Sequence, residues 1–159
     1  MSFLLIQLLT GLSTAAVLFL VSSGLSLIFG VTRILNFAHG SLYMLGAYLA
    51  YSLTQTLGGE GISFWASLAL ASIGTGIIGA GVELLVLRRI YQAPELFQLL
   101  ATFALVLVAQ DATLHLWGPE DLLGPQAPGL SGSIMLLGKP FPCYDLFLIG
   151  LASVVLLGL

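Results

Sequence analysis

Long apolar runs separated by short polar clusters set the pattern of this chain. Residues 3–29 carry no charged side chain, and the run exceeds the roughly 20 helical residues that cross a hydrocarbon core about 30 Å thick. Further apolar runs follow at 36–57, 63–87, 96–117 and 143–159. The pattern predicts an all-α, polytopic bundle of about five transmembrane helices, the last one incomplete, in a single membrane domain over residues 1–159.

The composition agrees with a membrane protein. Charged residues make up 7% of the chain and apolar residues 58%, with a mean hydropathy of +1.10, whereas about 25% of the residues of a soluble domain are charged. The net charge of -3 and the four basic residues give no nucleic-acid-binding surface. The single cysteine excludes an internal disulfide framework. Phosphate-loop and metal-site motifs are missing, so we expect no metal, no other cofactor and no enzyme activity.

A stretch rich in glycine and proline, residues 118–141, interrupts the apolar runs. Such a stretch is typical of a loop outside the membrane. Within it, residues 133–138 and the residues near Phe141 are expected to pair as a small hairpin.

Three arginines predict the orientation. Because successive helices alternate direction, Arg33 and the pair Arg88-Arg89 fall on one side of the membrane. The positive-inside rule makes that side cytoplasmic. The N-terminus, the turn at Glu60 and the loop 118–141 are then predicted to lie outside.

Polar side chains gather at the start of the second helix. Asn36, a good N-cap residue, His39 and Tyr43 are three or four residues apart and share one helical face. That face is expected to look into the bundle or into a water-filled pathway, and a helix N-terminus directs N–H groups towards it. Two interpretations have equal weight: these side chains line a translocation route, or they lock helices together by hydrogen bonds. Leu42, Leu45, Leu49 and Leu53 share another face of this helix.

The third and fourth helices carry two further candidates. In the third helix, small residues recur every three or four positions and form a seam that ends in a carboxylate. The seam consists of Ala69, Ser72, Gly76, Ala80 and Glu83. Such a seam predicts a close crossing with another helix. We expect Glu83 to form an ion pair with Arg88 or Arg89.

In the fourth helix, Asp111 and His115 share a face near the outer end. A structural or rim role is favoured over a proton relay or ion site. The alternative would make the protein a channel or an ion-coupled carrier. The segment Gly129-Leu130-Ser131-Gly132 matches a pattern of intramembrane serine proteases, but both histidines precede it, so we interpret the match as chance.

Several segments together resemble the N-terminal signature of branched-chain amino acid ABC transporter permeases. They are Gly24 to Gly30, then Arg33-Ile34-Leu35-Asn36-Phe37-Ala38-His39-Gly40, then Tyr43-Met44-Leu45-Gly46-Ala47-Tyr48. The Asn-Phe-Ala-His-Gly core is the specific part. The likeness continues weakly through Glu83, Arg88, Gln110-Asp111 and Trp117-Gly118-Pro119.

The resemblance implies an inner-membrane permease subunit of an importer. Its partners would be a second permease, two cytoplasmic ATP-binding cassette subunits and an external solute-binding protein. Permeases for urea or short-chain amides have nearly the same signature and are the alternative substrate class. Family members continue with a basic cytoplasmic loop and further spans, so this sequence is expected to be the N-terminal portion of a longer permease and incompetent for ATP-coupled transport alone.

Overall fold

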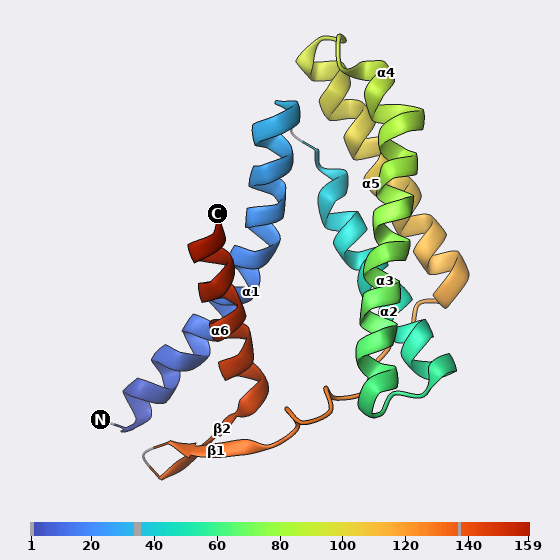
Figure 1. The fold of residues 1–159 in the computed structure, drawn as a ribbon. Helices are drawn as coiled ribbons and strands as arrows, with labels where there is room; N and C mark the ends of the chain where they lie inside the picture. The colour runs from blue at the N-terminus through green and yellow to red at the C-terminus, as the bar shows by residue number, and fades with distance from the viewer. Residues whose placement is uncertain (1, 34–35, 137) are drawn as a thin grey trace. The chain divides into compact units, whose positions relative to one another are not determined.

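The computed structural model describes residues 2–33, 36–136 and 138–159. They form two compact units, one of residues 1–24 with 126–159 and the other of residues 25–125. The long helix α1 (Ser2–Thr32) contributes residues to both units (Figure 1). Helices account for most of the described residues, so the all-α fold class is confirmed.

The first unit joins α1 to a hairpin and a terminal helix. The strands β1 (Ser133–Leu136) and β2 (Lys139–Pro142) are antiparallel, with Ile134 opposite Phe141, which confirms the predicted hairpin. Strand β2 leads directly into α6 (Cys143–Gly158). The Cys143 N–H donates to the Gly132 carbonyl at 3.0 Å. The hairpin therefore closes on the first residue of α6.

The second unit is built around α2 (Ala38–Leu57). This helix packs extensively on α3 (Gly61–Val82) and less extensively on α5 (Glu95–Trp117). Helix α3 continues without a break into a π-helical segment, η1 (Glu83–Leu87), and then into α4 (Arg88–Ile90). Helix α2 ends at Gly58, whose φ of +86° is a backbone conformation that residues with a Cβ rarely adopt. The chain turns there into α3.

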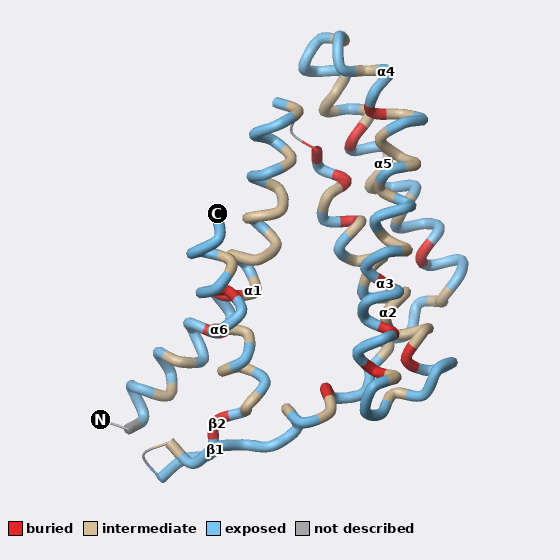
Figure 2. Tube along the Cα trace, in the orientation of Figure 1, coloured by how far each residue is buried: buried red, intermediate tan, exposed pale blue. Residues whose placement is uncertain are grey.

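Small hydroxyl residues occupy the interior of this unit. Ser67 and Thr102 are fully buried and Thr54 nearly so. Each hydroxyl donates to a carbonyl one turn earlier in its own helix, at 2.8 Å for Ser67 and Thr54 and 3.1 Å for Thr102. Large aliphatic side chains such as Ile62 and Leu107 are exposed instead (Figure 2). Small residues inside and large apolar residues outside are the arrangement expected when the surroundings are lipid.

Three helical stretches are long and apolar enough to cross a membrane: Phe3–Thr32, Gly61–Ile90 and Glu95–Trp117. They match the first, third and fourth predicted spans closely. The other two predicted spans correspond to α2, which is more polar, and to α6, which has 16 residues. The count of five spans stays a prediction.

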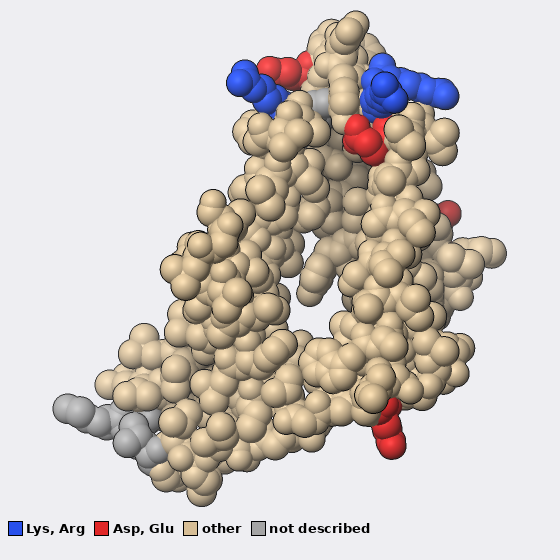
Figure 3. Space-filling view, viewed as in Figure 1, with Lys and Arg blue, Asp and Glu red and all other residues tan. Residues whose placement is uncertain are grey.

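Both ends of the second unit carry charged side chains, and Asp111 lies between them on α5. The basic groups seen in Figure 3 gather at one end, with Arg88 and Arg89 in α4, and a carboxylate is visible at the opposite end. Glu60 precedes α3, at the end of that helix remote from α4. Glu60 and the arginine pair therefore lie at opposite ends of the continuous helix from α3 to α4. Which side is cytoplasmic stays a prediction.

Candidate functional site

Asn36 organises the start of α2. Its side chain is 6% exposed. Its Oδ1 accepts a hydrogen bond from the Ala38 N–H at 3.0 Å, and its carbonyl accepts one from the His39 N–H at 3.2 Å. An asparagine that bonds the backbone two residues on forms an Asx-turn. The helix consequently begins at Ala38, two residues after the predicted cap, and Asn36 acts on the backbone of its own helix.

Ile34 and Leu35, which belong to the resembling segment, lie outside the described residues.

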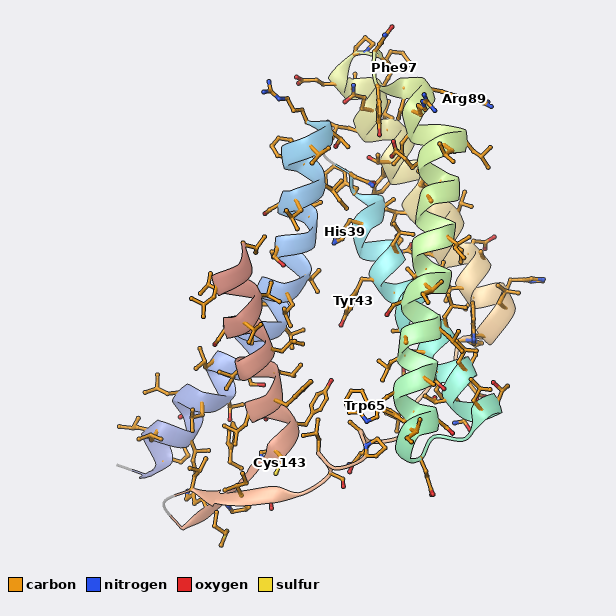
Figure 4. All side chains as sticks on the ribbon, in the orientation of Figure 1. His39, Tyr43, Trp65, Arg89, Phe97 and Cys143 are labelled. Atoms are coloured by element: carbon orange, nitrogen blue, oxygen red, sulfur yellow. The ribbon has the colours of Figure 1, made fainter. Side chains whose placement is uncertain are left out.

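His39 and Tyr43 project from the same side of α2, away from α3 (Figure 4). His39 is half-buried, with its Nδ1 atom shielded from solvent. Tyr43 is 57% exposed in this chain. The predicted common face is therefore present, and it presents an imidazole and a phenol hydroxyl one helical turn apart.

The leucine face of α2 makes the contact with α3. Leu42 and Leu49 lie against Gly79 and Gly74: a Cβ added to each glycine would be 3.5 Å and 3.7 Å from the respective leucine Cδ1. The two helices are also close at Gly46, where an added Cβ would lie 3.2 Å from Thr75 Oγ1. The leucine face is therefore the one that packs on α3, and His39 and Tyr43 lie on a different face of α2.

A third face of α2 meets α5. The Trp117 Nε1–H donates to Ser52 Oγ at 2.7 Å. The indole also packs on Tyr48, with ring centroids 5.2 Å apart. Sequence reasoning missed this cluster. Both Tyr48 and Trp117 stand in the segments that resemble the permeases, but nothing in their spacing pairs them.

The predicted seam on α3 is not the face that packs on α2. Ser72 and Ala80 are exposed, and Gly76 has no neighbour within 4 Å of an added Cβ. The buried small residues of α3 are instead Ser67 and Ala71. Helix α3 carries small residues on several faces, so their spacing alone does not select one. Packing of the seam against other segments stays a prediction.

The expected ion pair of Glu83 is corrected by the structure. Glu83 begins the π-helical segment, and its Oε1 accepts a hydrogen bond from the Tyr91 hydroxyl. The Gln98 amide donates to the carbonyls of Tyr91 and Ala93, at 3.2 Å and 2.9 Å. The turn between α4 and α5 thus brings Tyr91 to Glu83, and Arg88 and Arg89 remain exposed.

Asp111 and His115 are both exposed on α5. No hydrogen bond or ion pair joins them among the residues that the structure describes. Their proposed rim role is left as a prediction.

The geometry at the start of α2 provides hydrogen-bonding groups suited to a polar solute. The imidazole of His39 and the hydroxyl of Tyr43 each donate and accept, and the first N–H groups of a helix favour an anionic or carbonyl oxygen. No cluster of three or more His, Cys, Asp or Glu side chains within the described part of the chain has the arrangement of a metal site.

Comparison with known proteins places this geometry in context. Residues 7–157 match the family described as branched-chain amino acid transport system / permease component. The permease protein BraD of the high-affinity branched-chain amino acid transport system of Pseudomonas aeruginosa is 27% identical over 113 residues, covering 68% of this chain and 37% of BraD.

The corresponding LivH proteins give similar figures. LivH of Salmonella typhimurium is 26% identical and LivH of Escherichia coli 24% identical, each over 124 residues that cover 75% of this chain and 40% of the relative. The matches thus span about two fifths of the length of these relatives. No solved structure matches the chain.

Proposed function

We propose, from the premise that this chain belongs to the family of permease components of branched-chain amino acid transport systems, that it forms part of the membrane-spanning route of an ATP-binding cassette importer. The observation that carries the proposal is the family match over residues 7–157. The names of the relatives favour branched-chain amino acids over urea or short-chain amides as the substrate.

The proposed importer contains further subunits besides this chain. A second permease subunit would complete the pathway, two cytoplasmic ATP-binding cassette subunits would hydrolyse ATP, and an external solute-binding protein would deliver the substrate. The chain itself is proposed to bind no cofactor and to catalyse no reaction. It would lie in the cell (inner) membrane, with its N-terminus outside.

Within the chain, the proposed route runs along the face of α2 that carries His39 and Tyr43. Two observations support it: the leucine face is taken by α3, and these two polar side chains project to the other side (Figure 4). A solute passing this face would exchange hydrogen bonds with both groups. Asn36 is a positioning residue in this proposal, because its hydrogen bonds hold the first turn of α2.

The test compares the two histidines in the complete transporter. His39→Ala is expected to reduce ATP-dependent leucine uptake into membrane vesicles by about five- to tenfold, the equivalent of one lost hydrogen bond of about 1 to 1.5 kcal/mol. The matched control, His115→Ala, should leave uptake unchanged. The rate of ATP hydrolysis, measured in parallel, separates loss of the route from loss of the assembly.

The opposite result would support the second function class. If His115→Ala abolishes uptake, His39→Ala does not, and a proton ionophore stops transport without any need for ATP, then an ion-coupled carrier using Asp111 and His115 is the better account. Unchanged uptake in both variants would leave His39 with a packing role only. Competition by urea, measured in the same vesicles, distinguishes the two substrate classes.

A further inference from the structure

A second polar feature of the unit lies beside the later half of α2, away from His39. An open cavity of about 420 Å³ is lined by Ala47, Tyr48, Tyr51, Asp121, Leu122 and Leu123. The volume is within the range of small-molecule sites. The cavity brings two phenol rings and one carboxylate together from segments about seventy residues apart in the sequence.

The segment that carries Asp121 is held at both ends. At its start, the Gly118 N–H donates to the Leu114 carbonyl at 2.9 Å, and Gly118 adopts a φ of +81°. At its end, Pro125 packs on the backbone of Gly59 so closely that a Cβ there would lie 2.8 Å from Pro125 Cγ. Asp121 is therefore placed at the cavity by contacts of its own segment with α5 and with the turn after α2.

The aromatic wall of the cavity is also fixed. Tyr48 packs on Trp117 with their rings inclined at 44°, and Trp117 is in turn hydrogen-bonded to Ser52. The ring of Tyr48 thus has support on the side of α5. Preformed walls of this kind reduce the ordering cost of binding a small ligand.

The side chains that line the cavity favour a positively charged ligand. Its one charged group is the Asp121 carboxylate, and the basic residues of the unit, Arg33, Arg88 and Arg89, are not among the lining residues. Phenol rings attract ammonium groups through their π faces, and a carboxylate forms charge-assisted hydrogen bonds with them. Leu122, Leu123 and Ala47 add an aliphatic wall.

We propose that this cavity binds the primary ammonium group of a small aliphatic amine or amino acid. The inference deepens the proposed transport function, because a branched-chain amino acid carries both an ammonium group and an aliphatic side chain. Asp121 is the charge partner, and Tyr48 and Tyr51 provide the ring faces.

The experiment measures binding directly in the complete permease, reconstituted in lipid nanodiscs. With Trp65 replaced by Phe, Trp117 is the remaining tryptophan of this chain, and its fluorescence reports on the neighbouring cavity. The probes are 3-methylbutan-1-amine and its neutral analogue 3-methylbutan-1-ol. Ligand-observed saturation-transfer NMR gives a second readout that does not depend on quenching.

We expect the amine to bind and the alcohol to bind at least about tenfold more weakly, since one charge-assisted contact of about 1.4 kcal/mol corresponds to that factor. Asp121→Asn should remove this preference, and Asp121→Glu should retain it. Glu120→Gln is the matched control: it removes the same charge one residue away, outside the lining, and should have no effect. Helical circular dichroism verifies that each variant is folded.

Two results would overturn the inference: equal binding of amine and alcohol, or equal effects of Asp121→Asn and Glu120→Gln. The outcome is separable from that of the proposed function, because binding requires neither ATP nor partner subunits. Selective amine binding without leucine uptake would reject the transport proposal alone. Normal uptake without amine selectivity would reject the ammonium site alone.

Discussion

The hydrogen bond between Trp117 and Ser52 offers a sharp test of how α2 and α5 are held together. Trp117→Phe removes the indole N–H and keeps an aromatic ring against Tyr48, whereas Ser52→Ala removes the acceptor. The native bond is 2.7 Å long and partly buried. Each single substitution therefore deletes the same contact from opposite sides.

The magnitude follows from the membrane setting. Interhelical hydrogen bonds in membrane proteins average about 0.6 kcal/mol and reach about 1.7 kcal/mol. The short distance places this bond in the upper part of that range. We expect each single variant to lower the free energy of unfolding by about 1 kcal/mol, and the double variant to lose little more than either one, so that the coupling free energy is about 1 kcal/mol.

The assay is a double-mutant cycle in detergent micelles. Unfolding by increasing sodium dodecyl sulfate is followed by the helical circular dichroism of the full chain. Ser72→Ala is the control, because Ser72 is exposed on α3 and its hydroxyl donates to the Leu68 carbonyl of its own helix. A coupling free energy indistinguishable from zero would show that the bond does not join the helices, and the arrangement of α2 and α5 would need revision.

Two more predictions use the same unfolding assay. Gly46→Ala should lower the free energy of unfolding by about 1 kcal/mol, because its Cβ would lie 3.2 Å from Thr75 Oγ1. Gly76→Ala has open space around it and should raise the free energy of unfolding by up to about 1 kcal/mol, because alanine favours the helix over glycine. Equal effects of the two substitutions would contradict the close approach of α2 and α3. Asn36→Ala should cost about 1 kcal/mol through loss of the bond to the Ala38 N–H. Asn36→Ser, which keeps an acceptor oxygen, should recover most of that loss, and failure to do so would argue against the Asx-turn.

The parts of the fold that follow from local chemistry were predictable. The predicted span 96–117 differs from α5 (Glu95–Trp117) by one residue, because Pro94 and Gly118 mark both ends in the sequence. The hairpin was predictable for a similar reason, since glycine and proline bound its short strands. The common face of His39 and Tyr43 follows from helical periodicity alone.

The features that depend on tertiary contacts were not predictable. Small residues occur on more than one face of α3, and only the position of α2 shows that Ser67 and Ala71 are buried while Gly76 is open. The carboxylate of Glu83 was assigned to the nearest arginines by distance along an ideal helix. The structure brings Tyr91 to it through a turn whose path the sequence does not reveal. The cavity at Asp121 likewise needs the packing of Pro125 on Gly59.

The π-helical turn at Glu83–Leu87 gives α3 and α4 one residue more than an uninterrupted α-helix of the same path would need. Each residue of an α-helix advances the chain by about 100° around the axis. Without the π-helical turn, the same residue in ordinary α-helical geometry would rotate Arg88 and Arg89 by about a quarter of a circle relative to the part of α3 packed on α2. The π-helical turn therefore absorbs one residue and preserves the direction in which the two arginines face.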